Sequence, residues 1–220
     1  GEGLIEGNII ASNPTWSGGK ASITLSTSTG LTIQYQVNGI TEGSWKTGTS
    51  VTGLNHNDTV YARLTDGTNY GDYASVSIKD TINPSVPTIS LSGTAGNNSY
   101  YKSNVTVTIT AGSDAQSGAN KVRYKVTGAQ TVSQADTAAG TTSKSITIST
   151  DGTSTITAYT IDKAGNVSSA TTKIVYKDST APSTASLTVG TVGETSIAVT
   201  ASGADSTSGV YSYQFQRSTT

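Results

Sequence analysis

The sequence contains no cysteine and no methionine among its 220 residues, and charged side chains make up only 12% of it. Small secreted sandwich domains of animals usually carry disulfides, which the absence of cysteine excludes here. A cysteine-free chain in which about a third of the residues are Ser or Thr suits the surface of a bacterium. We therefore expect an extracellular or cell-surface location.

Basic runs and long apolar runs are also missing. The net charge is −1, so nothing in the sequence would attract a phosphate backbone or an anionic membrane. No apolar run approaches the roughly 20 residues that span a bilayer, and the opening GEGLIEGNII does not resemble a signal peptide. The sequence predicts neither a nucleic-acid partner nor insertion into a membrane.

Side chains suited to catalysis are scarce as well. The single histidine, His56, lies in the turn GLNHNDT, where we expect an exposed turn residue. A Ser-His-Asp site needs a positioned histidine base, and a glycosidase needs two facing carboxylates. The acids Glu2, Glu6, Glu42 and Glu194 are instead scattered over loops and linkers. We therefore expect no enzymatic activity.

A β pattern fills most of the chain. In NVTVTIT, the side chains of Val105, Val107 and Ile109 alternate with threonine, which is the period of two of a strand with one buried face. Thr, Val, Ser and Gly interrupt every stretch that could carry a helical period. Because only 33% of the residues are hydrophobic, we expect an all-β protein with several thin cores instead of one large core.

Two stretches nearly repeat one another along the chain. SIKDTINPSVPTISLSG begins at Ser77 and IVYKDSTAPSTASLTVG begins at Ile174, which puts Lys79 and Lys177 98 residues apart (177 − 79). This spacing is about the length of one immunoglobulin-like sandwich. It predicts modules at residues 1–80, 81–178 and 179–220, the last one incomplete, joined by Lys-Asp linkers whose prolines limit their freedom.

Three further alignments support duplication. The segments IQYQV, VRYKV and YSYQF occupy the position of the third strand in the three modules. SDAQSG and ADSTSG share Asp-x-x-Ser-Gly in the loop before that strand, at Asp114 and Asp205. VYARLTDGTN and ITAYTIDKAGN place Asp66 and Asp162 at the end of a strand whose alternate residues face inward.

The loop Asp-x-x-Ser-Gly followed by TAYTIDKAGNVS resembles the immunoglobulin-like repeats that occur in tandem on bacterial surface proteins, adhesins and secreted enzymes. The segment VTGLNHNDTVYARLTDG of the first module is similar to the fibronectin type III pattern. The resemblance implies tandem β-sandwich modules that act as spacers, stalks or adhesive modules. The first module departs from it, with STSTG in place of the Asp-x-x-Ser-Gly loop and GTN in place of AGN.

Acidic residues of the repeats are candidate ligands for a metal at the joints. In such a sandwich the incoming chain and two loops meet at one end, and calcium prefers six to eight oxygen ligands of the kinds found there. The side chains concerned are Asp80, Asp114, Asp162 and Asn166 at the second module, with Asp178 and Asp205 at the third. The alternative is that each aspartate caps a tight turn through its own side chain.

Aromatic residues offer a second kind of site, because flat rings stack on sugars. The candidates for carbohydrate binding are Trp16 and Trp45, with Tyr70, Tyr73, Tyr100 and Tyr101. Trp16 lies between SNPT and SGG and Trp45 lies in TEGSWKTG, so we expect both in loops. The alternative for each tryptophan is that it covers the edge of the first core.

The sequence therefore predicts a non-enzymatic repeat segment of a bacterial cell-surface or secreted protein: a stalk, adhesin or fibre subunit. Expected partners are glycans or a host surface, and copies of itself in a fibre, with GLIEGNII from one copy completing the third module of the next. Two alternatives stay open. One is carbohydrate-binding accessory modules of a secreted glycosidase, and the other is a phage tail or capsid decoration.

Overall fold

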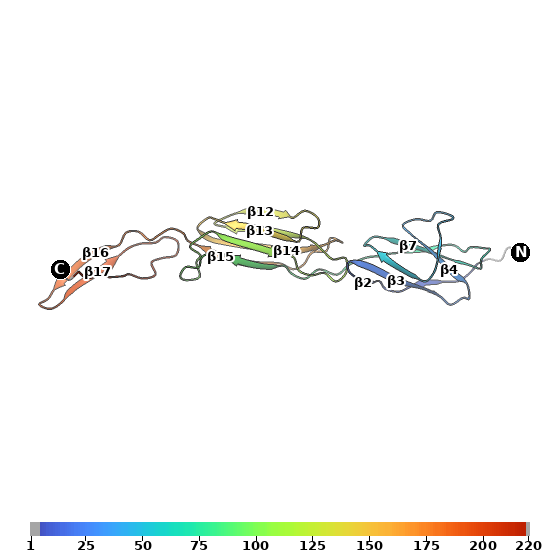
Figure 1. Cartoon of the computed structure of the whole chain (residues 1–220), viewed down its shortest axis with the longest axis horizontal. Coiled ribbons are helices and arrows are strands. Elements are labelled where there is room, and N and C mark those ends of the chain that lie inside the picture. The colour runs from blue at the N-terminus through green and yellow to red at the C-terminus, as the bar shows by residue number, and fades with distance from the viewer. Residues whose placement is uncertain (1–4, 219–220) are drawn as a thin grey trace.

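The computed structural model describes residues 5–218, which form antiparallel strands joined by turns and contain no helix. Figure 1 shows three bodies following one another along a line, with the two chain ends at opposite tips. Within the described range there is accordingly no apolar helix of membrane-spanning length. The prediction of an all-β chain of tandem sandwich modules, the last one incomplete, is confirmed.

The first module is a sandwich of two sheets. One sheet has the order β1-β3-β2 with β6 also paired to β3, and the other has the order β5-β4-β7-β8. The strands are β1 (Ile9–Ala11), β2 (Thr15–Ser17), β3 (Lys20–Thr27), β4 (Thr32–Val37), β5 (Lys46–Thr47), β6 (Ser50–Leu54), β7 (Thr59–Thr65) and β8 (Ala74–Ser77).

The second module repeats this arrangement with longer and more regular strands. Its sheets have the orders β13-β10-β9 and β12-β11-β14-β15. The strands are β9 (Thr88–Ser92), β10 (Val105–Thr110), β11 (Ala119–Gly128), β12 (Val132–Asp136), β13 (Ser143–Ile148), β14 (Gly152–Asp162) and β15 (Thr171–Lys177). The central pair β11 and β14 is in the same place as β4 and β7 of the first module, as the repeat predicts.

Each of the two modules buries its own core. The inward residues expected from the alternation are buried in both: Val60, Ala62, Leu64, Val105, Val107, Ile109, Ile156, Ala158 and Thr160. The first core draws on buried residues between Ala21 and Ile78, and the second on buried residues between Val105 and Val175. Two thin cores therefore replace one large core, in keeping with the low hydrophobic content.

The third module consists of one hairpin, β16 (Ser186–Val192) and β17 (Ile197–Ser202). The predicted third strand around Tyr211 is wrong, because residues 210–216 do not form a strand. The corresponding strands β4 and β11 each pair with two neighbours, and residues 179–218 contain no counterpart of those neighbours. Without a partner for its amide and carbonyl groups, an extended segment forms no ladder.

The segment proposed to complete another copy is partly engaged within its own module. Ile5 and Ile9 pack against the first core, and β1 pairs with β3. Gly3 and Leu4 of GLIEGNII lie outside the described residues. Donation of this segment to a second copy would therefore require the release of β1 from its own sheet.

The linear arrangement predicts a large radius of gyration in solution. A compact globule of 220 residues would have a radius of gyration of about 17 Å. Three bodies in line should exceed this value clearly, and small-angle X-ray scattering should give a pair-distance distribution with a long tail. A radius of gyration near that of the globule would contradict the end-to-end arrangement.

Candidate functional site at the joint between modules

The joint between the first two modules begins where β8 ends. Ile78 is buried in the first core, and Asp80, two residues later, is buried in the joint. The backbone amide of Asp80 donates to Nδ1 of His56 at 2.9 Å, and Nζ of Lys79 donates to Oδ1 of Asn57. The turn that carries His56 therefore holds the start of the linker, and His56 is half-buried instead of exposed as expected.

The carboxylate of Asp80 reaches into the second module. Its Oδ2 accepts the backbone N–H of Ser117 at 2.9 Å, and its Oδ1 accepts the N–H of Ile82 at 3.0 Å. Ser117 lies in the loop Asp-x-x-Ser-Gly, whose first residue, Asp114, accepts the N–H of Gly118 at 2.6 Å. Asp114 therefore stabilises the turn of its own loop. Asp80 connects that loop to the linker through a hydrogen bond.

The end of β14 supplies the third aspartate. Asp162 accepts the backbone N–H of Asn166 at 2.8 Å through Oδ1 and the side-chain amide of Asn166 at 2.8 Å through Oδ2. The same amide lies 3.3 Å from the carbonyl oxygens of Asp80 and Ile82. The turn DKAGN therefore connects the sixth strand of the second module to the linker.

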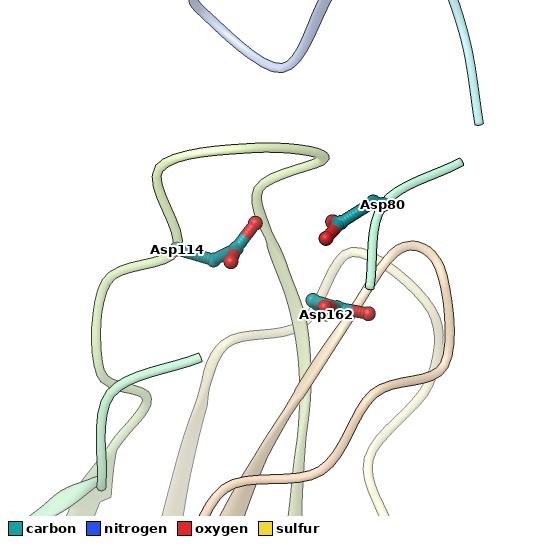
Figure 2. A group of neighbouring side chains, drawn as sticks. All are labelled: Asp80, Asp114 and Asp162. Carbon is teal, nitrogen blue, oxygen red and sulfur yellow. The ribbon is translucent and has the colours of Figure 1, made fainter. Parts of the chain in front are cut away.

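Figure 2 shows the side chains of Asp80 and Asp114 directed toward each other, with Asp162 next to them. One oxygen from each of Asp80, Asp114 and Asp162 lies within 4.8 Å of the others, and Asp80 and Asp162 are buried. Burial alone would raise the pKa of Asp80, but the nearby hydroxyl of Ser117 and the backbone amides of Ser117 and Ile82 together lower it. The Asp80 carboxylate is therefore ionised at neutral pH, inside a cluster of like groups.

This arrangement fits a divalent cation. Calcium binds oxygens at about 2.3–2.6 Å, so two oxygens on one ion are at most about 5 Å apart. The buried Oγ of Ser117 lies beside Asp80, and among the described residues it makes no hydrogen bond of acceptable geometry. A carboxylate oxygen that accepts one N–H keeps a second lone pair for a cation. The turn capping expected as the alternative is present. It does not use every lone pair of these carboxylates, so a metal could still be bound by them.

A hairpin of the first module approaches the Asp-x-x-Ser-Gly loop of the second. Gly18 and Gly19, in the hairpin between β2 and β3, both have positive φ. A Cβ on Gly19 would lie 3.1 Å from the carbonyl oxygen of Ser117. The hairpin of the first module therefore touches the Asp-x-x-Ser-Gly loop of the second, and glycine permits this close approach.

The second joint repeats the pattern. Asp178 accepts the N–H of Thr180 at 2.9 Å and the N–H of Ser208 at 3.2 Å, as Asp80 does with Ile82 and Ser117. Asp205 accepts the N–H groups of its own loop, like Asp114, and the pKa of Asp205 is lowered by those hydrogen bonds, first from Ser208. Residues 179–218 contain no carboxylate corresponding to Asp162, so only two of the three aspartates clustered at the first joint have counterparts at the second.

The second joint also has an ion pair that sequence reasoning missed. Lys177, the lysine of the Lys-Asp repeat, is 2% exposed, and its Nζ donates to Oδ1 of Asp151 at 2.5 Å. Asp151 also accepts hydrogen bonds from Ser179 and Thr180. The contact with Lys177 is the main cause that holds the pKa of Asp151 far below its usual range. In the sequence, this ion pair was indicated only by the repetition of lysine at positions 79 and 177.

The structure does not bring Trp16 and Trp45 together. Trp16 lies in β2, not in a loop, and packs half-buried against the first core. Trp45 precedes β5 on the opposite sheet, and its ring lies 4.3 Å from the guanidinium of Arg63. Tyr101 packs against the second core, and Tyr100 donates to the carbonyl of Thr207 across the second joint. Of the remaining candidates, Tyr70 shares the Arg63 contact with Trp45.

Comparison with known proteins gives likenesses of fold only. No family model matches the chain, and no curated protein matches it. Among solved structures, a two-domain fibronectin type III segment of chicken tenascin has 12% identity and a TM-score of 0.44, covering 78% of this chain and 99% of its own. Domains FN1–FN3 of chicken CNTN1 have 15% identity and a TM-score of 0.34, covering 89% of this chain and 74% of their own.

A third likeness is to the fibronectin(III)-like modules of Clostridium thermocellum CbhA, with 18% identity and a TM-score of 0.31. It covers 77% of this chain and 95% of that one. All three neighbours contain fibronectin type III or fibronectin(III)-like modules.

Proposed function

We propose that this chain is a non-enzymatic spacer segment of a bacterial cell-surface or secreted protein, a stalk or an adhesin, whose joints fix the direction of one module relative to the next. The observation that carries the proposal is the pair of joints, in which a linker aspartate is hydrogen-bonded to a loop of the following module. A flexible string of domains needs no such contacts, whereas a stiff stalk does.

We further propose that the first joint binds calcium. Asp80, Asp114 and Asp162 would supply carboxylate oxygens, with the Asn166 side chain and the buried hydroxyl of Ser117 beside them. When bound, the ion would neutralise like charges that lie within 4.8 Å of one another. It would also draw the linker, the loop and the turn into one geometry, because each contributes one of the three aspartates.

Calcium should therefore raise the midpoint of thermal unfolding. A ligand that binds only the folded state at ten times its Kd adds about 1.4 kcal/mol of stability, which corresponds to several degrees for a domain of this size. Melting the whole chain in calcium and in chelator tests this, with calorimetry to detect the heat of binding.

Asp114→Asn keeps an oxygen that can cap the turn but removes one charged ligand, so it should fold and lose most of the response to calcium. Asp66→Asn is the matched control, because Asp66 caps a turn in the first module in the same manner, away from the joint. Equal midpoints in calcium and chelator, with no heat of binding, would leave turn capping as the whole role of these aspartates. That result would not affect the spacer proposal, which depends on hydrogen bonds.

Completion of the third module by a strand of another copy remains a prediction for fibre assembly. Leu187, Val189 and Val199 are exposed on its hairpin, and such a surface favours the addition of a partner. A phage decoration would use the same modules and the same joints. Carbohydrate binding has a separate basis in the aromatic residues of the first module.

A further inference from the structure

The outer face of the sheet β5-β4-β7-β8 in the first module carries a cluster of aromatic residues. The inward residues of β7 are Val60, Ala62 and Leu64, so Tyr61 and Arg63 point outward. Tyr73, which precedes β8, meets Tyr61 edge to face at 5.7 Å between ring centroids. We call Tyr61, Arg63, Tyr70 and Tyr73, with Trp45, the tyrosine face.

Arg63 holds this face in place. Its guanidinium lies 4.3 Å from the ring of Trp45 and 3.9 Å from the ring of Tyr70. Two of its nitrogens donate to the carboxylate of Glu42 at 3.1 and 3.2 Å, and Nε donates to Gln34 at 3.0 Å. A cation bound by two rings and a bidentate carboxylate fixes the ring planes before any ligand arrives.

Two rings of this face remain open to solvent although their positions are fixed. Tyr70 and Tyr73 are each 52% exposed, whereas Arg63 is buried. Trp45 is half-buried against Arg63, so it supports the face from within, and the tyrosines provide the outer surface. The hydroxyls of Ser75 and Ser77, on exposed outward positions of β8, lie along the same side of the sheet.

The chemistry of the face favours a neutral sugar. Its outward residues on β4, β7 and β8 are aromatic or polar, and none of them is aliphatic, which argues against docking of an apolar protein surface. Glu42 neutralises the one cation of the cluster, so no free positive charge is left to attract an acidic polymer. Aromatic rings beside hydroxyl groups match a sugar ring, which has an apolar face and a polar edge.

We propose that the tyrosine face binds a neutral polysaccharide by stacking sugar rings on Tyr70 and Tyr73. The site is independent of the joint between modules and of calcium. It would add an adhesive function to the spacer segment, and it deepens the carbohydrate-binding alternative by naming the rings and the class of ligand.

The test is isothermal titration calorimetry of the whole chain with cellohexaose, mannohexaose and chitohexaose, and with oligogalacturonate as an acidic probe. We expect binding of at least one neutral probe, weakened about tenfold or more by Tyr73→Ala and by Tyr70→Ala, since tenfold corresponds to about one stacking contact. Tyr211→Ala, at an exposed tyrosine of the third module, is the matched control and should leave the affinity unchanged.

Tyr73→Ala leaves the contacts of Arg63 with Trp45, Tyr70 and Glu42 in place. A loss of affinity in this variant therefore cannot be attributed to disruption of those contacts. Thermal melts of each variant check that it is folded. Failure of all three neutral probes to bind would overturn the proposal. Binding of oligogalacturonate alone would overturn the neutral class, and neutral binding that survives both substitutions would place the site elsewhere on the molecule.

Discussion

Replacement of Asp151 by alanine should destabilise the second module by about 2–3 kcal/mol and lower its unfolding midpoint by roughly 10–20 °C. The reason is that the Lys177 side chain is 2% exposed and would lose its carboxylate partner, keeping a hydrogen bond to the Ser179 hydroxyl. Removal of one member of a fully buried pair costs about 3–5 kcal/mol, and we expect a smaller loss here because Asp151 is 25% exposed. Thermal and urea unfolding would measure the loss.

Asp136→Ala provides the matched control for this substitution. Asp136 pairs with Arg123 in the same module, but both side chains are about one third exposed, so its loss should cost under about 1 kcal/mol. The double variant Asp151→Ala with Lys177→Met should recover stability, since no buried charge is left unpaired. Equal effects of the two single substitutions would contradict a special role for the buried pair.

The same pair predicts how stability depends on pH. The folded-state pKa of Asp151 lies below its value in the unfolded chain, so the unfolded state takes up a proton first as the pH falls. The contribution of Asp151 is therefore complete above about pH 5 and declines below about pH 4. The Asp151→Ala variant should show a shallower fall in stability over that range than the natural sequence does.

Gly112→Ala should be the most damaging small substitution at the first joint. An added Cβ would lie 2.2 Å from the carbonyl oxygen of Ser85 and 2.5 Å from that of Val86, both in the linker. Backbone atoms cannot rotate away, so the linker would shift and its bond from Ser85 N–H to the carbonyl of Ser113, now 2.8 Å, would break. Overpacking of this kind costs about 1–3 kcal/mol.

The third module contains a control for this substitution. Gly203 occupies the place in ASGAD that Gly112 occupies in TAGSD, but its added Cβ would lie 3.6 Å from the nearest atom, the carbonyl oxygen of Ser183. Gly203→Ala should therefore be tolerated. Urea unfolding gives the cost of each change, and limited proteolysis of residues 81–87 reports release of the linker. Comparable losses for both substitutions would show that the clash with the linker is not the cause.

The sequence predicted most of the second module because its strands are regular. NVTVTIT buries every second residue, and Val105, Val107 and Ile109 could be assigned to the core from that alternation alone. The same reasoning missed short edge strands such as β5, which has two residues and no period to detect. It also overestimated the third module, where YSYQF has the composition of a strand but lacks paired neighbours within residues 179–218.

Those residues of the candidate site that belong to repeated sequence segments could be predicted from the sequence. Asp-x-x-Ser-Gly occurs before VRYKV and before YSYQF, so Asp114 and Asp205 could be matched with the linker aspartates before their positions were known. The role of His56 could not be predicted, since it depends on a turn from β6 to β7 that meets a linker 24 residues later. The contacts of Arg63 with Trp45 and Tyr70 likewise join segments that have no common pattern in the sequence.

The bond between Asp80 and Ser117 has a consequence for where one module ends and the next begins. By sequence Asp80 closes the first module, and its N–H is bound by His56 of that module. Its carboxylate nevertheless accepts the amide of Ser117, a buried residue of the second module. The residue is thus shared, and a fragment that starts at Thr81 would leave that buried amide without its acceptor. The same applies to Asp178 and Ser208, so neighbouring units of this chain overlap by one residue and no cut between them leaves both intact.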